Sequence, residues 1–485
     1  MSNKRKKVKK GISTFDFFCI GFGSIVGVGW AVSLNRWMAE CGGPLPASLG
    51  YILALIMMIP IALCYCELAP MIPVAGGGMA YAYKAFNQHV GFLSGWAAFG
   101  AFVTIIPWEA IYVVDILGIL APFLKGPELY VLAGVGIHLG HILIGTFFSI
   151  LLFYINYRGA SGSALLQRIL MLILVSVGLI AMVAALVKFD PNNFQPIYEN
   201  VGSGTHTGFF TGSLAILASA PFFLAGFETI PQAVEDASGD ITSVGKTVVL
   251  SVGLACVFYA LLLFCLGGAM PWQEFYGLPT PAASQLFKIA YDNYVGVILY
   301  YVVLIGALMG LFTTWNGFMM ASPRLLMGMA RGYMIPSFLA KQNHKYGTPT
   351  NALIVCFILS LVGPFMGMGL IDPLTSFSAA GFVFSWMVTA FCVVKLRKTD
   401  PHAHRPYKIP GGAATALFAG IIMIIVFLLL FIPGNPAFMG GTSVKFFVGW
   451  MAIGLVFYAL TSRKRNSLTV EEREKSVFEK PISDR

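Results

Sequence analysis

Long apolar stretches alternate with short polar or charged segments along almost the whole chain. A helix that crosses a bilayer needs about 20 predominantly apolar residues, so the pattern predicts about twelve membrane-spanning helices. The sequence therefore indicates an all-α integral membrane protein. The predicted spans are residues 13–35, 45–70, 90–121, 134–157, 163–187, 208–236, 243–271, 292–328, 350–370, 373–396, 411–433 and 441–462.

Two of these spans are interrupted near their middles by residues that weaken a helix. The first break is residues 21–29 (GFGSIVGVG), and the second is residues 225–231 (AGFETIP). Backbone groups freed at membrane depth are tolerated only where they meet protein, water or a ligand. Because paired breaks in two halves of a chain are typical of secondary transporters, the sequence predicts a binding site near the middle of the membrane.

The order of the spans divides the chain into two similar units. Five spans precede the loop 188–207 and five follow it, and each set opens with a broken segment. An odd number of spans inverts the second unit relative to the first, as in the leucine-transporter-like arrangement. The predicted divisions are a cytoplasmic basic leader 1–12, a first five-helix repeat 13–187, an inverted second repeat 208–396, helices eleven and twelve at 411–462 and a cytoplasmic tail 463–485.

Three shorter polar segments carry further expectations. Residues 79–86 are expected to form a short interfacial helix, and residues 329–347 a second helix with a turn. The polar residues after 465 are expected to be a mobile, solvated tail.

Composition supports the membrane assignment. Hydrophobic residues make up 57% of the chain, charged residues 11%, and the mean hydropathy is +0.79. The net charge is +10, yet 26 of the 31 Lys and Arg residues fall on the side that holds both chain ends and 5 on the other. Since such a bias marks the cytoplasmic side, we expect a multi-pass plasma-membrane protein with both termini in the cytoplasm, no cleavable signal peptide and no nucleic-acid partner.

Cysteine and histidine positions argue against redox or metal chemistry. The eight cysteines lie mostly inside apolar runs, where Cys behaves as a small hydrophobe, so no structural disulfide is expected. His138 and His141 share one face of the fourth span, but two histidines without a carboxylate favour packing over a metal site. No nucleophile–base set stands out, so the sequence predicts no enzyme, no cofactor and no metal.

Six motifs in order along the chain resemble those of the amino acid–polyamine–organocation (APC) superfamily of permeases. They are 23–29 (GSIVGVG), 65–77 (YCELAPMIPVAGG), 91–96 (GFLSGW), 226–228 with 235–236 (GFE and ED), 321–352 (opening ASPRLL and closing GTPTNA) and 405–412 (RPYKIPGG). The resemblance implies an amino acid transporter. Two features depart from the family pattern. The first is Val28, which stands where members often carry a small polar residue. Residues 170–176 also lack the lysine that replaces a sodium ion in some cationic-amino-acid relatives.

The first break predicts a site for the carboxylate of a substrate. A break exposes backbone N–H groups at the positive end of the following half-helix, where an anion binds without a cationic side chain. The carbonyls of Ala225 and Gly226 at the second break are expected to accept hydrogen bonds from the substrate ammonium. Alternatively, the glycines only allow close helix packing. The predicted residues of the first break are Ser24, Ile25, Gly27, Val28 and Gly29.

Glu228 is the most distinctive ionisable residue near the middle of the membrane. A carboxylate there costs about 2.5–3.5 kcal/mol on insertion scales, so it is expected to have a function or a partner. Because burial favours the protonated form, Glu228 is expected to carry a coupling proton. The alternatives are a structural hydrogen bond across the broken helix and a direct substrate contact.

The third span is expected to face the side-chain end of the substrate. Phe99, Val103 and Glu109 fall on one face at helical spacing. Glu109 is a candidate for recognising a cationic substrate tail, or it lies near the outer surface beside Arg36 or water. An otherwise apolar pocket favours a neutral amino acid. The resemblance places an aromatic lid over the substrate at Phe222.

Polar residues in the eighth span raise a further alternative. Thr313, Thr314 and Asn316 lie near where sodium-coupled relatives of this fold hold a cation. Threonine in a membrane helix, however, often bonds back to its own helix.

The combined reading is a permease that moves an amino acid or related amine across the plasma membrane by alternating access. An inner gate is expected where spans one and six meet the ends of spans three and eight. Symport, with protons as a possible partner, and antiport both stay open, and so does a monomer or a homodimer. A nutrient sensor that binds without transport is a rival, and a channel is disfavoured because no repeated polar ring is present.

Overall fold

The computed structural model describes residues 11–132, 134–201, 207–367, 371–435 and 437–478. Within these ranges, ten helical segments are long and apolar enough to cross a membrane. They are α1 (Thr14–Val26) with α2 (Gly29–Val32), α4 (Pro44–Met71), α6 (Gln88–Leu120), α7 (Leu139–Tyr157), α8 (Ala160–Val187), α11 (Ile241–Gly267), α14 (Tyr294–Arg331), α17 (Ile371–Thr399), α18 (Ala413–Phe431) and α19 (Gly441–Leu460).

Two shorter segments complete the predicted set of spans. They are α9 (Phe209–Phe223) with α10 (Thr229–Gln232), and α15 (Thr350–Ser360) with α16 (Gly363–Met366). The all-α membrane fold expected from the sequence is confirmed.

Both predicted breaks are present. The first separates α1 from α2 at Gly27, where φ is +48°, and the second separates α9 from α10, with Gly226 at φ +131°. Such dihedrals are readily adopted only by glycine. A Cβ on Gly226 would lie 2.6 Å from the carbonyl carbon of Ser24 and 2.7 Å from the amide nitrogen of Ile25. The two breaks therefore meet backbone to backbone, and a side chain at Gly226 would separate them.

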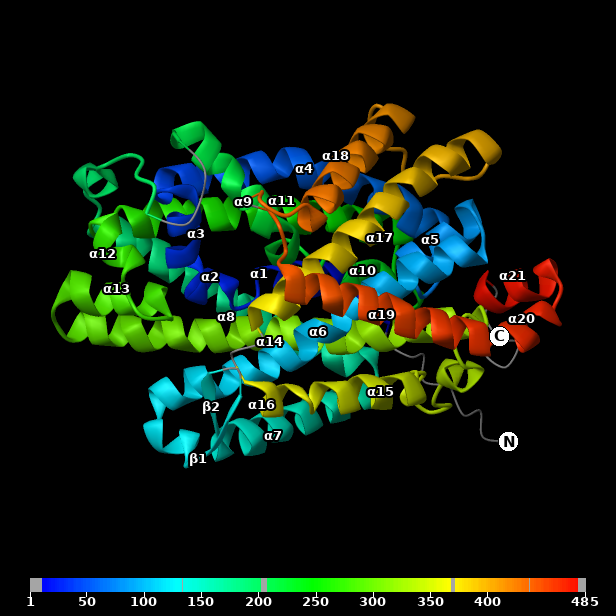
Figure 1. Cartoon of the computed structure of the whole chain (residues 1–485), viewed down its shortest axis with the longest axis horizontal. Helices are drawn as coiled ribbons and strands as arrows, with labels where there is room; N and C mark the ends of the chain where they lie inside the picture. Colours follow the sequence, from blue (N-terminus) through cyan, green and yellow to red (C-terminus); the bar gives the residue numbers. More distant parts are fainter. Residues whose placement is uncertain (1–10, 133, 202–206, 368–370, 436, 479–485) are drawn as a thin grey trace, which may run out of the picture.

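Figure 1 shows most of the long helices running along the long axis of the molecule. The end that carries α5 (Gly78–Ala85), α20 (Ser462–Asn466) and α21 (Val470–Phe478) is called the α5 end. The opposite end carries α12 (Trp272–Tyr276) and α13 (Ala282–Tyr291) and is called the α13 end. In the interior, α1 contacts α8, α11 and α14, while α4 packs along α11. The broken helix α1 is thus enclosed by other helices.

The short elements between the spans include one surprise. Residues predicted to begin the fourth span at 134 instead form the strand β2 (Val135–His138), which pairs antiparallel with β1 (Glu128–Leu132), and α7 begins at Leu139. The prediction was wrong because the apolar hairpin resembles the start of a helix in composition. The other short elements are α3 (Leu34–Cys41), η1 (Pro122–Lys125), η2 (Pro191–Phe194), η3 (Val234–Asp236) and η4 (Ser337–Ala340).

The polar tail is also more ordered than expected. Thr469 and Glu472 cap the start of α21 reciprocally, since each side chain accepts a hydrogen bond from the other residue's N–H. Val477 is 1% exposed, and the Phe478 ring packs edge-on against Tyr83 of α5. The expectation of a mobile tail was therefore wrong for residues 470–478; residues 479–485 lie outside the described ranges.

An ionic cluster at the α5 end explains two of the six motifs. Glu67 of α4 is 1% exposed and binds Arg397 of α17 at 2.6 Å, with Arg405 at 3.4 Å. Its carboxylate also accepts the N–H of Ile409 at 2.9 Å. Because a buried carboxylate is stable only when it is paired and hydrogen-bonded, these contacts fasten the loop 400–412 to α4.

Candidate functional site

At the first break, the backbone carbonyl groups have hydrogen-bond partners that some N–H groups lack among the described residues. Tyr259 of α11 donates its hydroxyl to the carbonyl oxygens of Ile25 (3.0 Å) and Val26 (2.8 Å), which α1 leaves free. No hydrogen bond from the N–H of Val28 is found among the described residues. The first N–H groups of any helix lack partners within that helix, and this applies to those that open α2. At this break the carbonyl oxygens therefore have a hydrogen-bond donor, whereas the N–H of Val28 has no acceptor among the described residues.

A cavity lies at this break and is called the central cavity. Most of the predicted site residues line it. These are Ser24, Ile25, Gly27, Val28, Gly29, Glu109, Phe222 and Ala225. The sequence missed seven further lining residues, namely Val26, Ile105, Trp108, Phe223, Tyr259, Thr314 and Phe318.

Three of the residues predicted to bind the substrate do not line the central cavity, and neither does Glu228. Phe99 packs against Trp96 and Trp450, with ring centroids 5.8 Å apart in each pair, so it faces α19. Val103 is buried elsewhere in α6, and Gly226 lies against the first break. The helix face of α6 toward the cavity instead carries Ile105, Trp108 and Glu109, at positions i, i+3 and i+4.

Glu109 is buried in the wall of the central cavity, and the described part of the chain provides no hydrogen bond to its Oε2 atom. Its exposure is 2%, its Oε2 atom makes no hydrogen bond, and no ion pair of the described residues includes it. Arg36, considered from the sequence as its partner, instead binds Glu40 at 2.7 Å. The rings of Trp108 and Phe222 line the same cavity with centroids 6.0 Å apart. A lone carboxyl beside aromatic rings is suited to a donor or cationic group.

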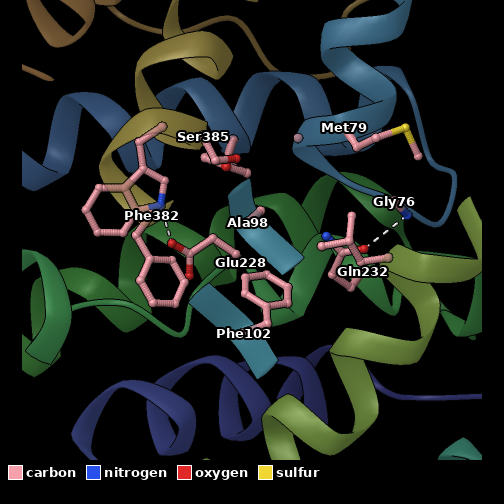
Figure 2. Close-up of a pocket in the computed structure, with 12 residues that line it drawn as sticks. Gly76, Met79, Ala98, Phe102, Glu228, Gln232, Phe382 and Ser385 are labelled. Atoms are coloured by element: carbon pink, nitrogen blue, oxygen red, sulfur yellow. Dashed lines mark hydrogen bonds between the residues drawn. The ribbon is translucent and has the colours of Figure 1, made fainter. Parts of the chain in front are cut away.

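Glu228 faces a second cavity. Its Oε2 accepts the N–H of Gly226 at 2.7 Å, and its Oε1 accepts the indole N–H of Trp386 of α17. The second cavity is called the Glu228 cavity, and Figure 2 shows the carboxyl within it. Among its lining residues, Tyr65, Gly76, Gly78 and Met79 come from the α5 end. Glu228 thus accepts a hydrogen bond within the second break, and it lines a cavity other than the central cavity.

Hydrogen bonds and ion pairs hold the α5 end together around η3. Gln232 accepts the N–H of Gly76 at 3.0 Å, as drawn in Figure 2. Glu235 pairs with Arg331 of α14 at 2.7 Å, and Asp236 pairs with Arg324 at 2.7 Å. The second broken span is therefore tied to α14 and to the loop before α5, where part of the inner gate was predicted.

The polar residues of α14 are occupied by protein partners. Thr313 donates to the carbonyl of Gly310 at 2.6 Å, so it bonds back to its own helix. Asn316 donates to Gln167 at 2.8 Å, and its amide oxygen accepts from Asn156 and Ser163 at 3.0 and 2.9 Å. The described residues hold no group of three or more His, Cys, Asp or Glu suited to a metal ion. His138 lies in β2 and donates its backbone N–H to His141. All eight cysteines are free and buried.

Two broken membrane-length helices whose breaks meet beside a cavity define a membrane transporter of the broken-helix type. Comparison with known families gives the narrower assignment. The family described as "Amino acid permease" matches residues 12–457, and the chain belongs to this family. It is an amino acid transporter, as predicted, and its family is one of transporters rather than enzymes.

Curated relatives of nearly the same length support the assignment. The chain is 26% identical to the branched-chain amino acid permease BcaP of Bacillus subtilis (strain 168), covering 96% of this chain and 95% of the relative. It is 23% identical to the methylthioribose transporter of the same organism, covering 96% of each. It is 22% identical to the aspartate-proton symporter of that organism, covering 87% of this chain and 80% of the relative. The relatives thus handle different solutes.

Proposed function

We propose that the chain carries an amino acid across the plasma membrane by alternating access, with the substrate held between the two breaks. The substrate carboxylate binds the free N–H groups around Val28, and the ammonium binds the carbonyl of Ala225. The carbonyl of Gly226 is less available, since it accepts from Thr229 at 2.5 Å. The central cavity at the free donors of the first break is the observation that carries this proposal. As in the sequence prediction, we propose that the two repeats span 13–187 and 208–396 and that helices eleven and twelve follow; the excess of Lys and Arg supports both termini in the cytoplasm.

In this proposal, Glu109 selects the substrate side chain. An unpaired carboxyl in a membrane protein interior is costly, so a partner that arrives with the substrate relieves that cost. Trp108 and Phe222 add aromatic faces beside it. The substrate class that fits is an amino acid whose side chain ends in a positively charged nitrogen. A neutral branched side chain, as named for BcaP, leaves the carboxyl without a partner.

Glu228 is proposed as the group that carries the coupling proton. It is buried, and it lies on the backbone of the second break through the N–H of Gly226. Gain or loss of a proton changes the strength of that hydrogen bond and so couples protonation to the shape of the break. The aspartate-proton symporter among the relatives makes proton coupling compatible with this type of chain.

Uptake into proteoliposomes tests the carboxylate site. A side chain at Gly27 would meet Oγ1 of Thr314 and force an unfavourable φ, so Gly27→Val is expected to abolish uptake while the protein still inserts. Gly434→Val is the matched control, since Gly434 also has a positive φ but open space around it. Normal uptake by Gly27→Val would contradict the proposed carboxylate site.

A ligand screen identifies the substrate and separates carrier from sensor. Thermal stability of the purified protein is measured with each amino acid and with common polyamines at two pH values. We expect cationic amino acids to raise the melting temperature most. The stabilising compound is then followed as a radiolabelled solute in vesicles. Binding without flux would show a nutrient sensor, and flux only against internal substrate would show an exchanger.

A further inference from the structure

The first break packs against a face of α14 that consists of two glycines with a threonine between them. Gly310, Thr314 and Gly317 are spaced by four and three residues, so they lie on one side of the helix. A Cβ on Gly310 would meet the carbonyl oxygen of Gly27, and one on Gly317 would meet Oγ of Ser24. The break therefore lies close against α14 at both glycines, and Thr314 supplies the side chain between these two contacts.

Thr314 can reach a molecule in the central cavity. It lines that cavity together with Gly27 and Val28 of the first break. Its hydroxyl lies against the backbone of Gly27, since a Cβ on that glycine would meet Oγ1 of Thr314. The next residue is Val28, whose N–H has no acceptor among the described residues. A hydroxyl donor and a backbone donor are thus neighbours in the wall of one cavity.

The hydroxyl of Thr314 is only weakly held by its own helix. It donates to the carbonyl oxygen of Gly310 at 3.4 Å, which is longer than the usual O–H···O bond. The same carbonyl oxygen accepts the hydroxyl of Thr313 at 2.6 Å. A hydroxyl has one hydrogen to donate and can turn it toward a stronger acceptor. A carboxylate is such an acceptor, because a hydrogen bond to an ionised oxygen is roughly twice as strong as a neutral one.

Thr313 provides a comparison within the same turn of α14. Its side chain is 0% exposed, its bond to the helix is short, and it is absent from the described lining of the central cavity. Thr314 is 7% exposed and lines the cavity. The two threonines therefore share their chemistry but differ in their access to a ligand.

The central cavity offers few groups that can bind an anion. None of the described residues that line it is Lys or Arg. A carboxylate there depends on neutral donors such as the N–H of Val28 and the hydroxyl of Thr314. Each oxygen of a carboxylate accepts hydrogen bonds, so two neighbouring donors suit one carboxylate group. The proposed ammonium contact is of the opposite kind, since the carbonyl of Ala225 is an acceptor.

We propose that Thr314 is a second donor to the substrate carboxylate and selects amino acids over amines that lack this group. This role rests on the proposed binding of the carboxylate at Val28. Thr314 gives up its long bond to Gly310 when the substrate enters and donates to the carboxylate instead. When the substrate leaves, the hydroxyl returns to Gly310, so the empty cavity does not hold an unpaired hydroxyl donor.

Thr314→Val tests this role, because valine has nearly the shape of threonine but no hydroxyl. Binding of lysine and of cadaverine, the same molecule without its carboxylate, is measured on the purified full chain. Choline chloride replaces sodium chloride, so that loss of a sodium ion cannot lower the affinity. We expect the affinity for lysine to fall about tenfold or more, as when a hydrogen bond to a charged group is lost. The affinity for cadaverine should stay unchanged.

Three further variants make the comparison specific to the hydroxyl at this position. Thr313→Val is the matched control and should leave both affinities unchanged. Thr314→Ser keeps the hydroxyl and should keep the preference for lysine. Thr314→Ala removes the hydroxyl without adding an apolar branch and should lose that preference, as Thr314→Val does. Thermal unfolding shows which variants are folded.

The outcomes distinguish the role of Thr314 from the carboxylate site itself. If the wild type binds lysine and cadaverine equally well, the carboxylate site proposed at the first break is wrong, and the role of Thr314 fails with it. If the wild type prefers lysine and the variants without the hydroxyl keep this preference, only the role of Thr314 is overturned. An equal loss of affinity for both ligands would also overturn it, since the threonine would then only shape the cavity. If the wild type does not bind lysine, selection by Glu109 is wrong, and leucine with isopentylamine replaces the first pair of ligands.

Discussion

The two breaks are similar in sequence character but differ in how their backbone is satisfied. At the first break, Tyr259 from another helix serves the free carbonyls, and the N–H of Val28 has no partner among the described residues. At the second break, Glu228 from the same segment accepts the N–H of Gly226. One break thus retains donors for a ligand, while the other carries its own hydrogen-bond acceptor.

The difference suggests that the two breaks have different functions. An unsatisfied donor in the membrane interior is expensive, so the first break is suited to a molecule that arrives and leaves. A carboxyl fixed to the second break cannot leave, but it can change its charge. In the proposed mechanism, the first break binds the substrate and the second responds to protons.

The largest expected effect comes from separating the two breaks. In Gly226→Ala the new methyl group meets the backbone of Ser24 and Ile25, and the φ of +131° is unfavourable for alanine. Overpacking alone costs about 1–3 kcal/mol, and here the neighbours are rigid backbone. We expect uptake to be lost and the melting temperature to fall, measured by vesicle uptake and thermal unfolding. Gly434→Ala should resemble wild type; wild-type behaviour of Gly226→Ala would show that close contact is dispensable.

Replacing the carboxyl group of Glu228 at the second break should have the next largest effect. Glu228→Gln keeps an oxygen for the N–H of Gly226 but cannot exchange a proton. Loss of a proton-transferring group typically costs about 100-fold or more, so gradient-driven uptake should fall to that extent while exchange persists. Uptake is measured over a range of external pH. A pH profile identical to that of wild type would assign Glu228 a purely structural role.

Glu109→Gln should separate substrates by charge. Removing one partner of a buried charged pair costs about 2 kcal/mol or more, which is roughly 30-fold in affinity for a cationic amino acid. Competition binding compares cationic and neutral amino acids in the two proteins. Neutral amino acids should bind the variant at least as well as the wild type. Equal loss for both classes would show that Glu109 supports the cavity rather than selecting its ligand.

The smallest effect is expected from a change at Tyr259, which donates to the first break from another helix. Tyr259→Phe removes the hydroxyl that serves the carbonyls of Ile25 and Val26. An unpaired buried polar group costs about 1–3 kcal/mol, and water in the central cavity can replace part of it. We expect a lower melting temperature and uptake reduced by roughly tenfold or less. If Tyr259→Phe is more harmful than Gly226→Ala, the carbonyl side of the first break matters more than the contact between the breaks.

The positions of the breaks could be predicted because helix-weakening residues act locally. Gly and Pro disturb a helix wherever they stand, so residues 21–29 and 225–231 identified the broken spans without any knowledge of packing. Their partners could not be predicted in this way. Trp386 lies 158 residues from the Glu228 that it binds, and Tyr259 lies more than 230 residues from Ile25. One tyrosine or tryptophan among many apolar residues gives no sequence signal for such a contact.

Errors at the edges of the site have similar causes. Phe99 and Val103 lie on α6 with Glu109, but the side of α6 that reaches the cavity depends on its packing against α14 and α17, which the sequence does not show. The interfacial helix at 79–86 was predicted from its pattern and is α5. Its packing against α17 could not be predicted, because only the fold brings the two helices together.

The contacts of α21 offer a way to monitor opening of the α5 end during transport. Ser476 of α21 donates to the carbonyl of Arg331 on α14 at 2.7 Å, while Glu474 pairs with Lys84 of α5 at 3.5 Å. A single short helix therefore bridges two parts of the α5 end. Should those parts move apart, α21 must release one of them, so a fluorescent dye attached to this helix would brighten or dim with each opening and report turnover without a labelled substrate.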